Sequence, residues 1–181
     1  MSRIFIALTP QEDFNKAITS LKEEQKKFLY KGSKVNWSSN NQHHITLNFV
    51  GAMEPEQKEE MFESFNNFSN LSILPIEVSH LSYFPNENGK VLVANIALST
   101  RLQKLYDKVE SVVARIGFGM ALRTFKPHMT LARFKDKDKP FSELVELENP
   151  ITYSVNSLDV YERVFDSGKT VHTLVRSYIF E

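Results

Sequence analysis

The tetrapeptide pattern His-x-Thr-Leu occurs twice in this chain, at residues 44–47 and again at residues 128–131. The two copies lie 84 residues apart, close to half of the 181-residue length. Each copy opens a run with the alternation of a strand and follows a long segment with the apolar periodicity of an amphipathic helix. The repeat therefore predicts two similar halves that bring the two motifs together at a central cleft.

Apolar periodicity and turn residues divide the rest of the chain into helices and strands. The expected strands cover residues 3–8, 35–37, 44–50, 73–84, 90–98, 128–134, 155–164 and 169–180. The expected helices cover residues 10–29, 55–68 and 100–116, the last with Ser99 or Thr100 as N-cap and Gly117 as its end. This irregular interleaving of strands and helices predicts an α+β protein and argues against a doubly wound parallel sheet.

The spacing inside each motif determines which side chains share a face of the strand. Side chains at positions i and i+2 of a strand point the same way, so His44 lies beside Thr46, and His128 beside Thr130. The residues between them then pack into the core. Each motif is expected to present one imidazole and one hydroxyl to the cleft from a rigid strand.

Two imidazoles on opposite sides of one cleft suit acid–base chemistry on a phosphodiester. An imidazole titrates near pH 6.5, so one ring of a pair can act as base while the other acts as acid. Each contributes about 10²–10⁴ in rate in general acid–base catalysis. The threonine hydroxyls can donate to non-bridging phosphate oxygens. A single copy of the motif is more often a structural strand histidine, and it is the duplication that favours catalysis.

Composition limits the ligand and the cellular setting. The 22 basic and 22 acidic residues cancel, so a phosphate ligand should be small or held by a local cluster, not by a broad basic face. The chain has no cysteine, which excludes disulfides, thiolate zinc sites and cysteine nucleophiles. No apolar run is long enough to cross a bilayer, and the first residues lack the pattern of a signal peptide. We therefore expect a soluble cytoplasmic protein without membrane association.

The other histidines lack a repeat partner. His43 faces away from its neighbour His44 on a strand, and His80 and His172 are expected to be structural. The histidine spacings typical of metal sites are missing, and so are the glycine-rich phosphate loops of nucleotide-binding folds. We expect neither a metal nor another cofactor.

Five segments carry a resemblance to a known family. They are RIFIAL at residues 3–8, HITLNFVG at 44–51, KVLVANI at 90–96, FKPHMTLARF at 125–134 and LDVYERVFDSGKTVHTL at 158–174. In this order and spacing they resemble the 2H phosphoesterase superfamily, and within it the RNA 2′,3′-cyclic phosphodiesterases, historically called 2′-5′ RNA ligases. The resemblance covers nearly the whole chain.

This resemblance implies a bilobal fold of two pseudo-symmetric halves, with antiparallel sheets lining a central cleft and helices outside. Residues 1–181 would form one domain of two interleaved lobes. The implied reaction is metal-independent hydrolysis of an RNA 2′,3′-cyclic phosphate to a 2′-phosphate. The resemblance makes His44 the general acid and His128 the group that activates water, with Thr46 and Thr130 binding the phosphate.

The resemblance also associates Phe49 and Arg133 with substrate contact. Strict strand alternation points both away from the cleft, unless a bulge or a strand end redirects them. Many family members carry a serine two residues after the tyrosine of the penultimate strand, whereas Tyr161 is followed here by Glu162 and Arg163. The expected partners are RNA ends or small nucleotides with a 2′,3′-cyclic phosphate, bound by a monomer that needs no protein partner.

Other interpretations of the same site stay open. The substrate could be a cyclic nucleotide, ADP-ribose 1″,2″-cyclic phosphate or a 2′-5′-linked oligoadenylate, with weak 2′-5′ ligation as the reverse reaction. A non-catalytic module that binds RNA ends is the alternative from another class. Formation of product would exclude binding alone.

Overall fold

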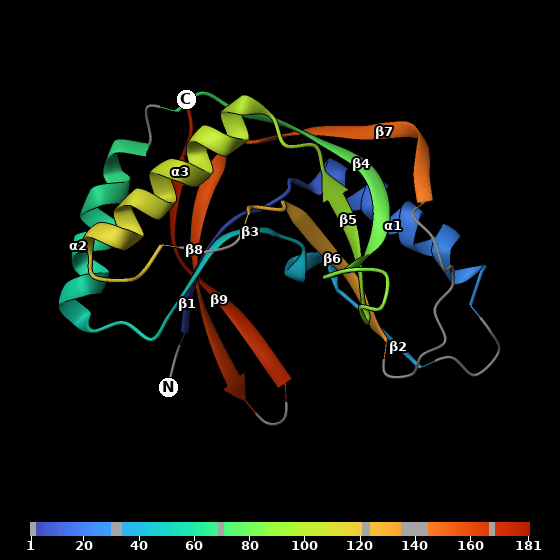
Figure 1. Ribbon diagram of the computed structural model, residues 1–181, viewed down its shortest axis with the longest axis horizontal. Coiled ribbons are helices and arrows are strands. Elements are labelled where there is room, and N and C mark those ends of the chain that lie inside the picture. The colour runs from blue at the N-terminus through green and yellow to red at the C-terminus, as the bar shows by residue number, and fades with distance from the viewer. Residues whose placement is uncertain (1–2, 30–33, 69–70, 121–123, 135–144, 167–168) are drawn as a thin grey trace.

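The computed structural model describes residues 3–29, 34–68, 71–120, 124–134, 145–166 and 169–181 (Figure 1). The helices are α1 (Glu12–Lys26), α2 (Pro55–Phe65) and α3 (Thr100–Arg115), with short 3₁₀ helices at Asn40–Gln42 and Asn66–Phe68. The strands are β1 (Arg3–Leu8), β2 (Val35–Trp37), β3 (Ile45–Gly51), β4 (Leu74–Phe84), β5 (Val91–Ile96), β6 (His128–Phe134), β7 (Val145–Val155), β8 (Ser157–Asp166) and β9 (Lys169–Ile179).

The strands of the described residues pair antiparallel in the order β7-β4-β5-β6-β3-β1-β8-β9, with β2 added beside β6. This order consists of two half-sheets. We call β3-β1-β8-β9 the first half-sheet and β6-β5-β4-β7, with β2, the second. The motif strands β3 and β6 lie at the boundary between the two half-sheets, which we call the seam. Within its half-sheet, each motif strand pairs with a strand that precedes a long helix in the sequence: β3 with β1, before α1, and β6 with β5, before α3. The expected α+β fold with antiparallel, pseudo-symmetric halves is confirmed.

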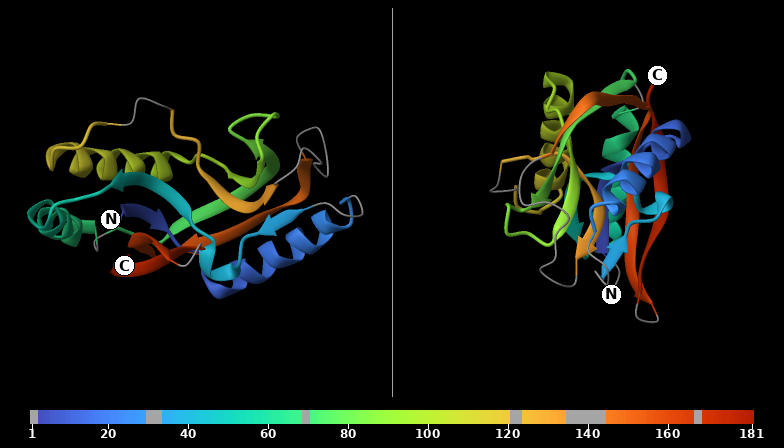
Figure 2. Two further views of the ribbon diagram at one scale, coloured as in Figure 1. Left: turned by 90° about the horizontal axis from the view of Figure 1, so that it is seen from below. Right: turned by 90° about the vertical axis from the view of Figure 1, so that its right-hand side faces the viewer.

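The helices cover the half-sheets in exchanged positions. Helix α1 precedes the first motif but packs on the second half-sheet, where Phe14 stacks on Tyr153 of β7 with ring centroids 3.4 Å apart. Helix α3 precedes the second motif but packs on the first half-sheet, where Glu110 accepts a hydrogen bond from Asn48 of β3. In the left view of Figure 2, α1 lies at the opposite end of the molecule from α2 and α3. Each motif is preceded by a long helix, as expected, but each half-sheet is covered by the helix that precedes the other motif.

The ends of α3 follow the local signals in the sequence. The Ser99 hydroxyl accepts the Leu102 amide at 3.2 Å, as an N-cap does. Gly117 follows the helix with a φ of 95°, a left-handed conformation that glycine adopts without steric cost. The Phe118 amide then reaches the Val113 carbonyl at 3.2 Å, which satisfies a carbonyl of the last turn.

Strand β7 is absent from the sequence-based prediction. Its residues include two glutamates and Pro150, which weaken a strand pattern. The strand lies at the edge of the sheet, where proline is tolerated because one side needs no ladder hydrogen bond. Its pairing with β4 also jumps between Ile151 and Glu146, so the strand is bent around the proline. Whether a strand lies at the edge of a sheet depends on the tertiary fold, so the sequence alone does not show it.

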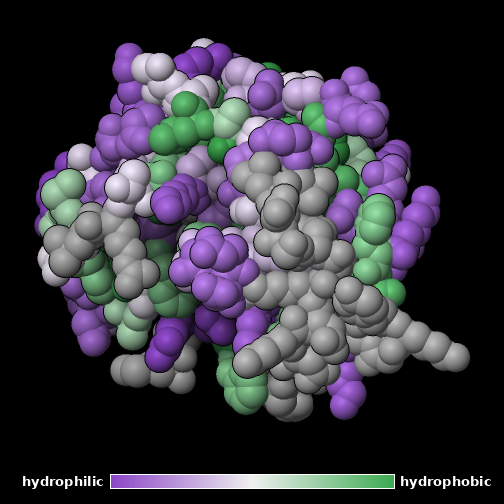
Figure 3. All heavy atoms as spheres, turned by 45° about the vertical axis from the view of Figure 1, so that its right-hand side comes forward, coloured by the Kyte–Doolittle hydropathy of each residue, from purple (hydrophilic) through white to green (hydrophobic). Residues whose placement is uncertain are grey.

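Hydrophilic and hydrophobic residues are interspersed over the coloured part of the face in Figure 3. Most of the buried apolar side chains belong to one continuous core, which runs under both half-sheets and the helices. In the part of the chain that the structure describes, no helix is long and apolar enough to cross a membrane.

Candidate active site

The two motif strands meet at a single residue pair. Ile45 of β3 lies opposite Met129 of β6. Among the described residues, this is the one backbone strand pairing between the two half-sheets. Both side chains are fully buried. They anchor the seam in the core at the position directly after each motif histidine.

This pairing arranges the four motif side chains around one point. Extending the antiparallel register by one residue on each side sets His44 opposite Thr130 and Thr46 opposite His128. Side chains alternate along a strand, so these four lie on the side away from the buried pair. Each imidazole thus lies opposite a hydroxyl from the other half-sheet, a cross-pairing that follows from the antiparallel register.

A cleft of about 810 Å³ opens over this arrangement. Its walls come from both half-sheets and from the segment between β2 and β3. They include every residue that the sequence singles out for catalysis or substrate contact: His44, Thr46, Phe49, His128, Thr130 and Arg133.

Two β-bulges bring Phe49 and Arg133 into this cleft. The pairing of β3 with β1 skips Leu47, and the pairing of β6 with β5 skips Leu131. A bulge adds one residue to the strand and so shifts the alternation that follows it. Phe49 and Arg133 then lie on the cleft side, where both are exposed. Strict alternation fails here at the fourth residue of both motifs.

The two catalytic candidates are held by equivalent hydrogen bonds. The Nδ1 atom of His44 lies 2.7 Å from the Gln42 carbonyl oxygen, and that of His128 lies 2.7 Å from the Lys126 carbonyl oxygen. A carbonyl oxygen only accepts, so each Nδ1 carries the proton. The Nε2 atom of each neutral ring is therefore a free base, and the Nε2 of each protonated ring is an acid.

Both imidazoles have lowered pKa values. Burial disfavours the charged ring and lowers the pKa of His44 to about 4, with smaller downward contributions from the neighbouring His172, His128 and Arg133. Burial is also the main reason why the pKa of His128 is lowered, and Arg133 adds to it. In the free protein both rings are neutral near pH 7.

His172 is a cleft residue that sequence reasoning missed. Its ring on β9 lies 5.4 Å from the His44 ring, centroid to centroid, in an edge-on arrangement. Arg163 and Thr170, from the same hairpin, also line the cleft. None of the three has a counterpart in the repeat. The only available signal was the hairpin itself, whose register sets Arg163 opposite His172.

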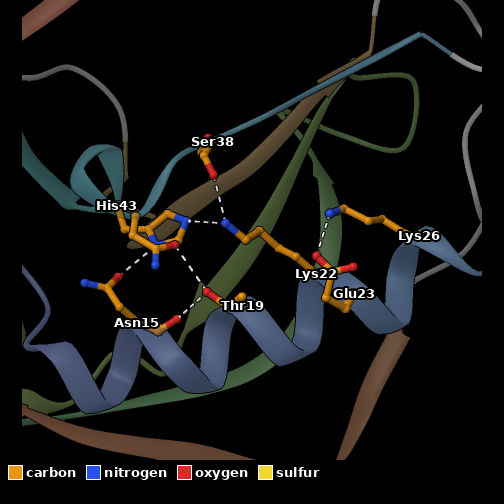
Figure 4. A network of polar contacts seen from close by, with 8 residues as sticks. Asn15, Thr19, Lys22, Glu23, Lys26, Ser38 and His43 are labelled. Carbon is orange, nitrogen blue, oxygen red and sulfur yellow. Dashed lines mark hydrogen bonds and ion pairs between the residues drawn. The ribbon is translucent and has the colours of Figure 1, made fainter.

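A buried polar network lies behind the His44 segment (Figure 4). His43 is 1% exposed and Lys22 of α1 is 6% exposed. The Lys22 ammonium donates to the Ser38 carbonyl at 2.8 Å and to Nε2 of His43 at 3.2 Å, while Nδ1 of His43 donates to the Asn15 side-chain oxygen at 2.8 Å. The network holds the segment between β2 and β3 in place. This segment includes Gln42, whose carbonyl oxygen accepts the hydrogen bond that orients His44.

Acid should destabilise the protein through these buried rings. The pKa of His43 is lowered to about 4, first by burial and then by Lys22, and His44 has a similarly low value. Between pH 6.5 and about 4 the unfolded chain binds protons that the folded state does not, so the free energy of unfolding falls as the pH falls. Urea titrations across this range measure the slope, and His43→Gln is expected to make it shallower. An unchanged slope in that variant would show that His43 is not held neutral.

Among the described residues, no group of three or more histidine, aspartate or glutamate side chains is arranged to hold a metal ion. The chemistry available in the cleft is that of imidazoles, hydroxyls, guanidinium groups and aromatic rings. This set can move protons and bind an anion.

Solved structures share the fold. The crystal structure of TT0787 of Thermus thermophilus matches with a TM-score of 0.83 at 20% identity, covering 98% of this chain and 97% of that one. E. coli LigT complexed with 3′-AMP matches with a TM-score of 0.76 at 19% identity, covering 99% and 98%.

Sequence comparisons identify the family. An RNA 2′,3′-cyclic phosphodiesterase of Thermotoga maritima is 24% identical over 183 residues, which cover 99% of this chain and 96% of the relative. The model of the 2′-5′ RNA ligase superfamily matches residues 7–166. The resemblance drawn from the paired motifs is thereby confirmed, and the chain belongs to the 2′-5′ RNA ligase superfamily.

Proposed function

We propose that this protein hydrolyses RNA 2′,3′-cyclic phosphate ends to 2′-phosphates without a metal ion. The observation that carries the proposal is the pair of imidazoles in one cleft, each with Nδ1 bound to a backbone carbonyl and Nε2 available for proton transfer. The name of the Thermotoga maritima relative, an RNA 2′,3′-cyclic phosphodiesterase, supports this substrate.

In the proposed reaction His128 acts as general base and His44 as general acid. Nε2 of His128 takes a proton from water while the water oxygen forms a bond to phosphorus. The bond between phosphorus and the 3′-oxygen breaks, and the 3′-oxygen takes the proton from Nε2 of His44. The product is a 2′-phosphomonoester with a free 3′-hydroxyl, and a proton transfer through solvent resets the two rings.

The low pKa of His44 fits an acid that is charged only when substrate is bound. The negative charge of the cyclic phosphate favours a neighbouring imidazolium and raises its pKa again. Thr46 and Thr130 would donate hydrogen bonds to the non-bridging oxygens, and the Arg133 guanidinium would balance the charge that develops on them. Phe49, which is 48% exposed, offers a ring face for a nucleobase to stack on.

Product analysis in the presence of a chelator tests the proposal. Purified protein is treated with EDTA and incubated with adenosine 2′,3′-cyclic phosphate and with a short RNA that ends in one, and the products are separated from authentic 2′- and 3′-phosphates. We expect 2′-phosphate to form at the same rate with and without chelator. Loss of turnover in EDTA would refute the metal-independent mechanism. Absence of any product would refute hydrolysis and favour the alternative, a non-catalytic module that binds RNA ends.

A wider range of small nucleotide substrates is the second candidate. E. coli LigT has been crystallised with 3′-AMP, ATP and NADP⁺ as well as with phosphate, and its fold is the one described here. A cleft of about 810 Å³ has room for a whole nucleotide. Cyclic nucleotides, ADP-ribose 1″,2″-cyclic phosphate and 2′-5′-linked oligonucleotides are therefore compared in the same assay.

We propose a single domain over residues 1–181 that works as a cytoplasmic monomer without an obligate protein partner. Supporting this, the described residues of one chain line both sides of the cleft, and the sequence has no cysteine.

A further inference from the structure

Three nitrogen-rich side chains form a row across the first half-sheet. Arg3 of β1 pairs with Arg163 of β8, which pairs in turn with His172 of β9. Residues directly opposite each other on antiparallel strands project from the same face. Arg163 and His172 line the cleft, so this face is the one that also carries His44.

The row is electrostatically unfavourable without a ligand. Positive groups directly opposite each other repel, and Arg163 contributes to the lowered pKa of His172 after burial. None of the ion pairs among the described residues includes Arg3 or Arg163. Glu162, next in the chain, lies 3.8 Å from the Lys58 ammonium on α2 and so faces the other side of the sheet. An anionic ligand in the cleft would relieve this repulsion.

His172 also has an unsatisfied polar atom. Its Nδ1 is buried and has no hydrogen-bond partner among the described residues. Buried polar atoms in native proteins nearly always have a partner, and an exception calls for a ligand or a water. The His172 ring lines the cleft beside Arg163, and an imidazole N–H next to a guanidinium is a suitable pair of groups for binding phosphate oxygens.

This pair adjoins the proposed reaction centre. The His172 ring lies 5.4 Å from the His44 ring, and Phe5 packs against both rings at 4.9 Å and 5.0 Å. A ligand on Arg163 and His172 would thus sit beside the cyclic phosphate but would not replace it. In a nucleotide strand, the next phosphate is the one on the 5′-oxygen of the same nucleotide.

We propose that Arg163 and His172 bind a second phosphate group of the substrate, the one on the 5′-oxygen of the nucleotide that carries the cyclic phosphate. This inference rests on the proposed function and narrows its substrate class. The 5′ group can be a terminal phosphate or the linkage to the preceding nucleotide, since both present the same anionic oxygens. A nucleoside 2′,3′-cyclic phosphate with a free 5′-hydroxyl leaves the pair unused.

Binding of reaction products tests the subsite without depending on turnover. Calorimetry compares adenosine 2′-monophosphate with adenosine 2′,5′-bisphosphate on the wild-type protein. We expect the bisphosphate to bind about 10- to 100-fold more tightly, the range for hydrogen bonds between charged groups. Equal affinities would overturn the subsite, whether or not the protein is an active hydrolase.

Kinetics then distinguishes the two sources of the phosphate. Values of kcat/KM are compared for three substrates: adenosine 2′,3′-cyclic phosphate, its 5′-phosphorylated form, and a dinucleotide of two adenosines joined by a 3′-5′ linkage that ends in the cyclic phosphate. A gain for both phosphate-bearing substrates indicates that either source is recognised, and a gain for the 5′-phosphorylated form alone indicates recognition of a terminal phosphate. A gain for the dinucleotide alone would assign the effect to the added nucleoside and refute the subsite. If all three are hydrolysed equally, the subsite is wrong but the proposed function stands.

Variants assign the effect to the pair. Arg163→Gln and His172→Gln should each remove most of the preference for the 5′-phosphate, measured within each variant as the ratio of kcat/KM for the 5′-phosphorylated substrate to that for the 5′-hydroxyl substrate. Arg163→Lys should restore part of it, because the positive charge is kept. Arg176→Gln is the matched control, since Arg176 lies on the same strand as His172 but stacks on Phe62 of α2, 4.4 Å from its ring. An equal loss of preference in Arg176→Gln would show a general charge effect and refute the subsite.

Discussion

Replacing His128 by alanine is expected to lower kcat on a 2′,3′-cyclic phosphate by about 10²–10⁴-fold, the usual contribution of a general acid or base. His44→Ala should cost a similar factor, because the Nε2 atoms of both rings take part in the same displacement. The double variant should lose much less than the product of the two factors, since removing one partner already disables concerted proton transfer. Single-turnover rates, with saturating enzyme in excess over substrate, measure these losses directly.

The control for this prediction is a histidine outside the cleft. His80 on β4 hydrogen-bonds to the neighbouring Ser79 hydroxyl at 2.8 Å and does not line the cleft. His80→Ala should therefore keep kcat near the wild-type value. Thermal unfolding of all variants shows whether a loss of rate reflects a loss of fold. Turnover retained in a folded His44→Ala or His128→Ala variant would contradict the paired-imidazole mechanism.

Truncating the residue pair at the seam is expected to cost about 2–5 kcal/mol of stability for each side chain. Ile45 and Met129 are fully buried and provide the only backbone pairing between the half-sheets among the described residues. Ile45→Ala and Met129→Ala each leave a cavity at this position, where neighbouring elements have little freedom to collapse. Urea titration near pH 7 measures the change in the free energy of unfolding.

An exposed isoleucine on β9 provides the matched control for these truncations. Ile179 is 58% exposed, so Ile179→Ala should change the free energy of unfolding by no more than about 0.5 kcal/mol. A loss at Ile45 no larger than at Ile179 would mean that the seam contributes nothing to holding the half-sheets together.

The sequence predicted those features that depend on local signals. Alternation identified both motif strands, and apolar periodicity identified all three helices to within a few residues at each end. Ser99 and Gly117 marked the ends of α3, because a cap and a left-handed glycine act over only one turn. The grouping of four motif side chains in one cleft followed from the repeat, since duplicated halves meet about a common axis.

The features that the sequence did not reveal depend on which strands become neighbours. The bulges at Leu47 and Leu131 exist only relative to the partner strands β1 and β5, so alternation alone pointed Phe49 and Arg133 the wrong way. His172 reaches the cleft because β9 pairs with β8, which pairs with β1. The pairing of β8 with β9 is that of a local hairpin, but the pairing of β8 with β1 leaves no periodic pattern in the chain.

The exchanged helices bear on how the cleft keeps its shape. The chain passes from one half-sheet to the other between β1 and α1, between β2 and β3, between α2 and β4, on both sides of α3, and between β7 and β8 (Figure 1). Spreading the half-sheets apart would therefore pull each helix away from the surface it covers, at a cost in buried apolar area. These covalent crossings hold the spacing of the two imidazoles before any ligand arrives. In the proposed reaction, the protein would then stabilise a short-lived pentavalent phosphorus without first closing around it.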